Sequence, residues 1–188
     1  RIVFIDDGST DGSAEVLRAL AERHPQVEVL RFRRNFGKSA ALAAGFARVR
    51  GDVVFTMDAD LQDDPAEIPR FLAKLEEGFD VVVAWKRKRH DPWHKTFPSR
   101  VYNGFVARLF KLPLHDVNCG FKLYRAEVAR GLQVYGELHR LLPALAQGLG
   151  YRIVEIPVTH HPRTYGVSKY GFERFAKGAM DVLAVWFL

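Results

Sequence analysis

The chain has 188 residues, of which 48% are hydrophobic and 27% charged, and its formal net charge is +6. This length and apolar content exclude a disordered protein and suit one globular domain with its own core. With a single cysteine, Cys119, the chain can form neither an intrachain disulfide nor a cysteine-rich metal site. The basic balance favours an anionic partner: a phosphate compound, a membrane surface or a nucleic acid.

Short β-branched runs alternate with helical patterns along the chain. The predicted strands are 2–5, 27–31, 52–57, 80–84, 121–125 and 152–158. The predicted helices are 11–23, 38–49, 65–76, 98–110, 126–132, 138–149 and 169–186. This alternation predicts a three-layer α/β fold on a mostly parallel sheet, with ligands at the carboxyl ends of the strands. The polar, aperiodic segment 86–98 is predicted to be a loop.

Both ends of the sequence indicate a fragment of a longer protein. Arg1 leads directly into a strand without a starting methionine, and the chain stops inside the apolar run at 182–188. We expect further chain before residue 1 and a hydrophobic segment after residue 188. Within the sequence no signal peptide is recognisable, and no uninterrupted apolar stretch reaches the roughly 20 residues of a membrane span.

An acidic loop, "IDDGSTDGS" at 5–13, follows the first predicted strand. Gly8 allows a positive φ, and three residues can cap the next helix. These are Ser9, Thr10 and Asp11. A turn and a cap do not account for Asp6 and Asp7, which end an apolar strand, so both are candidate binding residues.

A second acidic loop, within "TMDADLQDDP" at 56–65, follows the third predicted strand. Asp58, Asp60 and Gln62 alternate, so in an extended segment their oxygens would face one side. Mg²⁺ or Mn²⁺ accepts one or two protein carboxylates and fills its shell with substrate phosphates, so this loop is a candidate cation site. The remaining residues, Asp63, Asp64 and Pro65, are predicted to open the next helix.

Five motifs occur in order along almost the whole chain: "DDGSTDGS", "RNFGKSAAL", "DADLQDDP", "VNCGFKLYR" and "RTYGVSKYG". Together they resemble the family 2 inverting glycosyltransferases of GT-A fold, in the branch of dolichol-phosphate mannose synthase and its bacterial polyprenyl-phosphate relatives. The resemblance implies a Rossmann-like GT-A fold and one catalytic domain over residues 1–188. The family's opening strand is missing here, which indicates N-terminal truncation. In many bacterial relatives membrane helices follow this domain, so the C-terminal cut would precede membrane segments.

The resemblance assigns the donor side of the site. Asp6 or Asp7 would contact the nucleotide base or ribose, and Asp58 would help to hold the nucleotide. Together with Asp58, the residues Asp60 and Gln62 would bind Mg²⁺ or Mn²⁺, which would offset charge on the departing nucleoside diphosphate.

Two further segments would lie near the phosphates. At 35–42, Lys38 carries charge and Ser39 can cap the next helix, although an ordinary helix start with a solvated lysine is an alternative. At 160–171, the family's segment folds over the donor diphosphate and the acceptor phosphate. Its donor-binding residues would be Arg163, Ser168 and Lys169.

The segment 85–100 is the predicted acceptor site, because its basic residues suit a lipid phosphate and its aromatic residues suit a membrane interface. The predicted acceptor-binding residues are Lys86, Arg87, Lys95, Ser99 and Arg100. The sequence reads Trp-Lys-Arg where many dolichol-type members read Gly-Ser-Arg, so the division of roles between Lys86 and Arg87 stays open. A solvated basic loop is the alternative.

The family also has an acid near Asp116 that faces the acceptor, as a base or an orienting group. The alternative for Asp116 is an aspartate that ends a helix, and Cys119 is interpreted as a packing residue. Asp116 and Asp60 are therefore the predicted catalytic residues. The amphipathic segment 135–146 is predicted to pack in the core, and three of its residues are further candidates for the acceptor cleft. These are Glu137, His139 and Arg140.

The sequence therefore predicts a metal-dependent inverting hexosyltransferase at the cytoplasmic face of a membrane. It would move a sugar from a UDP- or GDP-sugar to a polyprenyl phosphate, dolichyl or undecaprenyl. The first alternative is a saccharide hydroxyl acceptor, which would need a true general base. The second is a nucleic-acid-binding module, but the acidic strand ends and the lack of one continuous basic stripe favour no nucleic-acid partner.

Overall fold

The computed structural model describes residues 1–87, 93–162, 182 and 185, and for residues 93–98 it describes the backbone alone. The predicted helix at 169–186 therefore lies almost entirely outside the described residues. The chain divides into two compact units, each described by itself below. Unit 1 comprises Arg1–Val49 and Gln133–His139, and unit 2 comprises Arg50–Leu132 and Arg140–Leu188.

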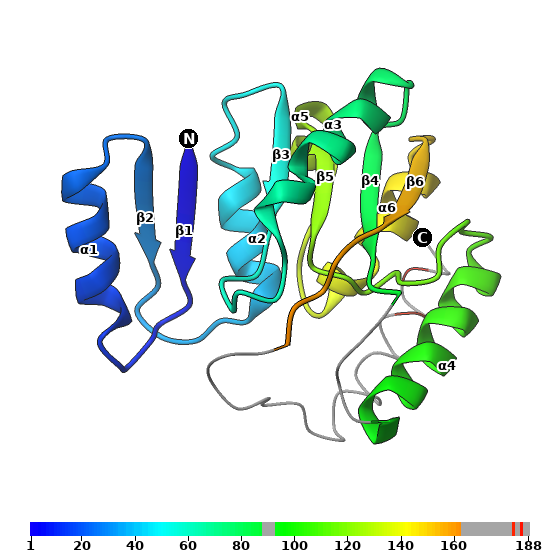
Figure 1. Cartoon of the computed structure of the whole chain (residues 1–188), viewed down its shortest axis with the longest axis horizontal. Helices are drawn as coiled ribbons and strands as arrows, with labels where there is room; N and C mark the ends of the chain where they lie inside the picture. Colours follow the sequence, from blue (N-terminus) through cyan, green and yellow to red (C-terminus); the bar gives the residue numbers. More distant parts are fainter. Residues whose placement is uncertain (88–92, 163–181, 183–184, 186–188) are drawn as a thin grey trace. The chain divides into compact units, whose positions relative to one another are not determined.

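Unit 1 is built from two parallel strands and two helices (Figure 1). In chain order these are β1 (Ile2–Asp6), α1 (Ser13–Arg23), β2 (Val27–Arg31) and α2 (Lys38–Phe46). The register places Asp6, at the end of β1, opposite Arg31, at the end of β2. Gly12 is the N-cap residue of α1 and no side chain caps this end, so the prediction that Ser9, Thr10 or Asp11 caps the helix is wrong, although Asp11 accepts a hydrogen bond from the Ser13 N–H at 3.0 Å.

Unit 2 contains a four-stranded sheet in the order β3-β5-β4-β6. Its strands are β3 (Val53–Thr56), β4 (Val81–Trp85), β5 (Lys122–Arg125) and β6 (Ile153–Pro157). Because β5 is antiparallel to both neighbours while β4 pairs parallel with β6, the strands β3, β4 and β6 run in one direction. The sheet is thus mostly parallel, as predicted. All six predicted strands are present, with bounds within one residue of the prediction.

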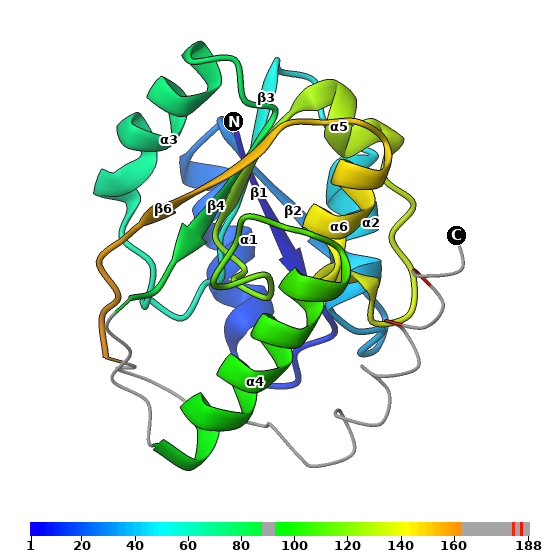
Figure 2. The ribbon, with the colours of Figure 1, turned by 90° about the vertical axis from the view of Figure 1, so that its right-hand side faces the viewer.

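Helices lie on both faces of this sheet, so unit 2 has three layers (Figure 2). They are the 3-10 helix η1 (Pro65–Glu67), α3 (Ile68–Glu76), α4 (Trp93–Leu109), α5 (Ala126–Gly131) and α6 (Leu142–Gly148). The view in Figure 2 shows α3 on one face and α5 and α6 on the other. The valines at 81–83 are 0% exposed, because both faces of β4 are covered. On the α3 face the rings of Phe55, Phe71 and Phe121 pack with centroids 4.8, 5.0 and 5.4 Å apart.

Several predicted helix boundaries are wrong: α2 ends at Phe46 and not at residue 49, the helix predicted at 65–76 is divided into η1 and α3, and two further differences involve proline. The segment 86–98 is not a continuous loop, because α4 already begins at Trp93. Proline is common in the first turn of a helix, so Pro98 favoured a start near that position, whereas here it lies within the helix. The predicted helix at 138–149 is divided into the 3-10 helix η2 (Leu138–Arg140) and α6, which has Pro143 in its first turn. Within the described residues, no helix is both long enough and apolar enough to cross a bilayer.

Candidate functional site

The first acidic loop, residues 6–11, follows β1 in unit 1. The Oδ1 atom of Asp6 accepts a hydrogen bond from the Ser9 N–H at 2.8 Å. Its Oδ2 atom lies 3.4 Å from Nε of Arg31 as an ion pair, and the side chain is 1% exposed. Asp6 therefore closes the turn and faces β2, a structural role that the sequence analysis did not assign to it.

Asp7 also holds the backbone in place. Its Oδ1 atom accepts from the Phe36 N–H at 2.7 Å, and its Oδ2 atom accepts from the Gly37 N–H at 2.9 Å. These two bonds fasten the segment before α2 to the end of β1. Both aspartates thus shape the loop, and their contact with a nucleotide base or ribose stays a prediction.

The start of α2 differs from the prediction. Gly37, with φ 91°, is the N-cap residue, and no side chain caps this end, so the prediction that Ser39 caps α2 is wrong. Ser39 is buried, and its Oγ lies 3.0 Å from Nδ1 of His139 and accepts the His139 N–H at 3.2 Å. His139, a candidate for the acceptor cleft, is therefore tied to α2 within unit 1. Lys38 is the first residue of α2 and is exposed.

Gly8 is required where the first acidic loop meets the segment before α2. It has φ 72°, and a Cβ atom there would lie 2.4 Å from the carbonyl carbon of Arg34. We expect Gly8→Ala to lower the free energy of unfolding by about 1–3 kcal/mol in urea denaturation. Gly12→Ala is the matched control, because a Cβ atom at Gly12 meets nothing within 4 Å. Equal losses in the two variants would contradict this account.

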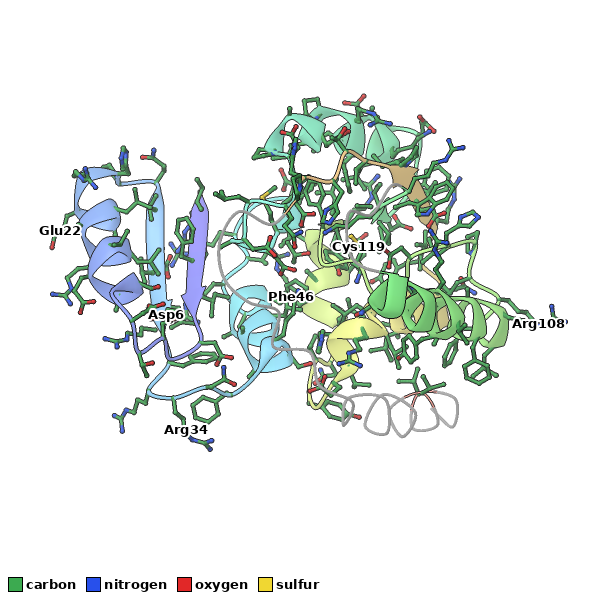
Figure 3. The ribbon with its side chains drawn as sticks, turned by 60° about the horizontal axis from the view of Figure 1, so that its bottom comes forward. Asp6, Glu22, Arg34, Phe46, Arg108 and Cys119 are labelled. Atoms are coloured by element: carbon green, nitrogen blue, oxygen red, sulfur yellow. The ribbon has the colours of Figure 1, made fainter. Side chains whose placement is uncertain are left out.

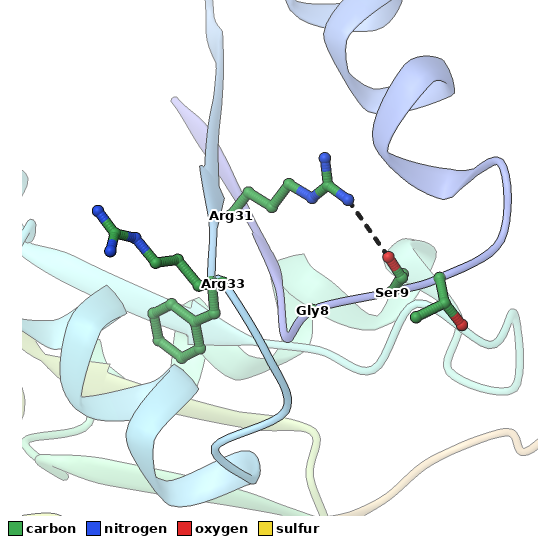
Figure 4. Close-up of a pocket in the computed structure, with 6 residues that line it drawn as sticks. Gly8, Ser9, Arg31 and Arg33 are labelled. Carbon is green, nitrogen blue, oxygen red and sulfur yellow. Dashed lines mark hydrogen bonds between the residues drawn. The ribbon is translucent and has the colours of Figure 1, made fainter.

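An open pocket of about 350 Å³ lies beside the first acidic loop (Figure 4). The lining residues are Gly8, Ser9, Thr10, Arg31, Phe32 and Arg33. A guanidinium N–H of Arg31 donates to the Ser9 carbonyl at 3.4 Å, which is the dashed line in Figure 4. The pocket combines backbone polar groups, an aromatic ring and two guanidinium groups. This chemistry suits a ligand that has both a planar ring and negative charge.

The second acidic loop, residues 58–64, follows β3 in unit 2 and is bent rather than extended. Leu61 has φ 60°, and the Gln62 N–H donates to Oδ1 of Asp60 at 3.2 Å. The premise that alternating side chains face one side is therefore wrong. The amide nitrogen of Gln62 donates to the His161 carbonyl at 3.3 Å, and the side chain is buried beside residues 160–161.

The cation site at Asp58 and Asp60 stays a prediction. Within the residues that the structure describes, no three or more His, Cys, Asp or Glu side chains are grouped to hold a metal ion. Mg²⁺ and Mn²⁺ need no such group when substrate phosphates and waters complete the shell. The Gln62 N–H uses one of the roughly four acceptor positions of the Asp60 carboxylate. Asp58 and Asp60 therefore remain the predicted ligands, whereas Gln62 gains no support as a third ligand.

The other two aspartates of this loop have folding roles. Asp64 caps η1 by accepting the Ala66 N–H at 2.9 Å, as predicted, and this bond together with His161 lowers the pKa of Asp64. Asp63 does not open the helix. Its side chain is 0% exposed, and Oδ1 lies 2.6 Å from Nζ of Lys86, which follows β4 and is 11% exposed.

The positive charge of Lys86 offsets part of the negative charge of this loop. Burial would lower the pKa of Lys86, but the neighbouring acidic groups of Cys119, Asp63 and Asp58 outweigh it and raise the pKa. The thiol of Cys119 carries no charge at neutral pH, because burial, then the nearby Asp116, raise its pKa to about 12. At neutral pH the two carboxylates therefore keep the ammonium charged. Lys86 is thus an ion-pair partner of the acidic loop, and its contact with the acceptor phosphate stays a prediction.

Asp116 lies in a buried network at the loop before β5. It is 4% exposed, and its Oδ1 accepts a hydrogen bond from Nδ2 of Asn103 on α4 at 3.0 Å. Oε2 of Glu155, on β6, accepts the His115 N–H at 2.7 Å and the Asp116 N–H at 3.4 Å. Because α4 ends at Leu109, Asp116 does not terminate that helix, and this alternative is wrong.

Cys119 lies in the interior of unit 2 (Figure 3) and is 3% exposed. A thiol whose pKa is raised to about 12 is protonated and a poor nucleophile at neutral pH. These properties agree with the interpretation of Cys119 as a packing residue.

The predicted acceptor residues are only partly described. Arg87 is exposed, with its guanidinium carbon 5.8 Å from the centre of the Trp85 ring. On α4, Ser99 is half-buried and Arg100 is exposed, while Lys95 is described in its backbone alone. The predicted phosphate-binding residues Arg163, Ser168 and Lys169 lie outside the described residues.

Four residues of these networks were missed as partners by the sequence analysis. They are Asp63, Asn103, His139 and Glu155. Their partners lie between 13 and 100 positions away in the sequence, so no local spacing marks them. The charge of Glu155 was one available signal, because it interrupts an otherwise apolar strand.

Known proteins resemble this chain both in sequence and in fold. A sequence profile described as glycosyl transferase family 2 matches residues 1–132. A dodecaprenyl-phosphate galacturonate synthase of Rhizobium johnstonii is 38% identical over 99% of this chain and 56% of its own length. An undecaprenyl-phosphate 4-deoxy-4-formamido-L-arabinose transferase of Edwardsiella ictaluri is 38% identical over 97% of the chain and 56% of its own length. The chain therefore spans a little over half the length of these curated relatives.

Among solved structures, glucosyl-3-phosphoglycerate synthase from Mycobacterium tuberculosis superimposes with a TM-score of 0.67 and 21% identity. That structure is a complex with Mn²⁺ and uridine-diphosphate-glucose, and the match covers 97% of this chain and 65% of that one. The same enzyme with Mg²⁺ and uridine-diphosphate gives a TM-score of 0.68 at 20% identity, over 97% and 66%. The similarity confirms the predicted GT-A fold.

Proposed function

Because the chain belongs to glycosyl transferase family 2, we propose that the protein transfers a sugar from a nucleotide-sugar donor to a polyprenyl phosphate. One observation in the structure carries the proposal. The loop after β3 carries four carboxylates, of which Asp63 and Asp64 have folding roles, while Asp58 and Asp60 are hard oxygen ligands of the kind that a cation bound to a diphosphate takes. The names of the relatives from Rhizobium johnstonii and Edwardsiella ictaluri, both polyprenyl-phosphate sugar enzymes, support the acceptor class.

Each unit, taken by itself, has features that suit a nucleotide-sugar donor. The pocket beside the first acidic loop has the chemistry for a nucleotide, and a UDP-sugar is the first donor to test, with a GDP-sugar as the second. Mg²⁺ or Mn²⁺, held by Asp58 and Asp60, would stabilise the charge of the departing nucleoside diphosphate. The ammonium of Lys86, fixed by Asp63 beside Asp58, adds a positive charge that is already in position before the donor binds.

The acceptor phosphate is ionised at neutral pH, so it needs little help from a base. It would attack the anomeric carbon on the side opposite the diphosphate and invert the configuration. Arg87, Lys95, Ser99 and Arg100 would bind this phosphate, and Asp116 would orient it, with Arg163, Ser168 and Lys169 as proposed contacts beyond the described residues. Because the acceptor is a lipid, the reaction would take place at a membrane surface, and the cytoplasmic face is the proposed side.

The experiment measures two rates in one preparation with a radiolabelled donor: transfer to polyprenyl phosphate and hydrolysis of the donor by water. Arg100→Ala is expected to reduce transfer about tenfold, because a hydrogen bond to a charged group contributes about 1.5–3 kcal/mol, and to leave hydrolysis unchanged. Arg108→Ala is the matched control, since Arg108 is exposed and points outward from the end of the same helix (Figure 3).

Three other outcomes are informative. Equal losses of transfer and hydrolysis in Arg100→Ala would place Arg100 at the donor. The same transfer rate in both arginine variants would remove α4 from the acceptor site. Wild-type transfer to a saccharide but not to polyprenyl phosphate would overturn the proposed acceptor and favour a hydroxyl nucleophile, for which Asp116 would have to act as a base.

A further inference from the structure

Asp116 is held from two directions. Its carboxylate receives the amide N–H of Asn103 on α4, and its backbone N–H is bound by Glu155 on β6. The carboxylate of Glu155 also pairs with the ring of His115, and that ring stacks on Trp85 with centroids 4.2 Å apart. Glu155 therefore anchors the backbone of the loop, and Asn103 holds the side chain of Asp116.

The amide of Asn103 is poorly explained by stability alone. Asn103 is 3% exposed, and within the described part of the chain its Oδ1 atom has no hydrogen-bond partner. Leaving a buried acceptor unsatisfied is unfavourable. The orientation of the amide follows from its partner, because a carboxylate accepts hydrogen bonds and only the nitrogen of the amide can donate one. The contribution of this buried amide is therefore its hydrogen bond to the carboxylate of Asp116.

The position of Asn103 on α4 relates its hydrogen bond with Asp116 to the proposed acceptor-binding residues of the same helix. Ser99 and Asn103 are four residues apart in α4, so they lie on the same side of the helix, and Arg100 is adjacent to Ser99. An acceptor phosphate bound by Ser99 and Arg100 would engage the helix one turn before the residue that holds Asp116. A shift of α4 on acceptor binding would therefore move the donor of the Asp116 hydrogen bond.

We propose that Asn103 is a positioning residue that links the acceptor-binding part of α4 to the carboxylate of Asp116. The inference rests on the proposed function for its acceptor, but the hydrogen bond that carries it can be tested separately. Asn103 does not touch the reacting atoms. It fixes the Asp116 carboxylate against the acceptor, so its loss affects transfer to the acceptor and not the binding of the donor.

The kinetic test uses Asn103→Ala in the complete protein. We expect kcat for transfer to fall about 10- to 100-fold, because a small misplacement of an orienting group can reduce a rate about 100-fold. The KM for the donor and the rate of donor hydrolysis should stay within about twofold of wild type, since neither involves the acceptor. Val106→Ala is the matched control, because Val106 is 0% exposed on the same helix and truncation there loosens α4 while keeping Asn103. An equal fall of kcat in Val106→Ala would overturn the proposal.

A double-mutant cycle with Asp116→Ala tests whether Asn103 and Asp116 act together, because alanine removes the acceptor of their hydrogen bond. If Asn103 acts through Asp116, then Asn103→Ala should lower kcat little further in the Asp116→Ala background. The same cycle measured by melting temperature should also be non-additive, and this arm needs no acceptor. Additive melting temperatures would overturn the inference whatever the acceptor is. A wild-type enzyme that is inactive with polyprenyl phosphate, combined with coupled melting temperatures, would instead overturn only the proposed function.

Discussion

Lys86→Met is expected to lower the free energy of unfolding by about 3–5 kcal/mol, because it leaves a buried charge without its partner. The Asp63 side chain is 0% exposed, and Nζ of Lys86 lies 2.6 Å from its Oδ1 atom. Methionine keeps the length and the apolar stem of lysine and removes the charge, so packing changes little. Urea denaturation followed by circular dichroism measures the loss.

The matched control is Lys74→Met, which breaks an ion pair of similar length on the surface. Nζ of Lys74 lies 2.7 Å from Glu77, with side chains 32% and 51% exposed. A surface pair of this kind contributes at most about 1 kcal/mol. If Lys86→Met lowers the free energy of unfolding no more than Lys74→Met does, then the Lys86–Asp63 pair does not offset the negative charge of the acidic loop.

Two further measurements separate the charge from the packing. The double variant Lys86→Met with Asp63→Leu should recover much of the stability, since replacing both ions removes the unpaired charge. The dependence on pH follows from the raised pKa of Lys86. The folded state holds this proton more tightly than the unfolded state, so the contribution is complete below about pH 10.4 and is lost as the pH rises through the raised pKa. The difference between wild type and Lys86→Met should therefore shrink in strong alkali.

The strands could be predicted from the sequence because their signal is local. The valines at 81–83 form a short β-branched run between polar segments, and a buried strand with both faces covered needs no alternation. The antiparallel direction of β5 could not be predicted in this way, because the residue pattern of 122–125 does not depend on whether the strand runs parallel or antiparallel to its neighbours. Strand pairing depends on contacts between distant segments, which a local pattern does not contain.

The second acidic loop shows which features of the site could not be predicted from the sequence. The sequence alone shows the excess of negative charge around Asp58 and Asp60. It does not show the compensating ammonium of Lys86, which lies more than 20 positions later and was predicted to bind the acceptor. The expected alternation of side chains is broken at Leu61, which adopts φ 60° although it is not a glycine. A bend at such a residue is imposed by its surroundings and leaves no mark in the sequence.

Asp60→Asn is expected to reduce sugar transfer about 100- to 1,000-fold in the complete protein, because several kcal/mol of leaving-group stabilisation depend on a metal-bound diphosphate. The fold should survive the change. Oδ1 of Asp60 accepts the Gln62 N–H at 3.2 Å, and the carbonyl oxygen of an asparagine can accept the same bond. The bend with Leu61 at φ 60° would then persist while the charge of one ligand is lost.

Asp64→Asn is the control that removes the same charge from the same loop. Asp64 caps η1 through the Ala66 N–H, and asparagine caps a helix about as well, so its transfer rate and stability should stay close to wild type. Binding of UDP with Mn²⁺, measured by thermal shift, should raise the melting temperature of wild type and of Asp64→Asn but not of Asp60→Asn. Full activity of Asp60→Asn in the presence of a chelator would refute the cation site. Equal losses in both variants would instead attribute the effect to the net charge of the loop, since the two substitutions differ only in which carboxylate is removed.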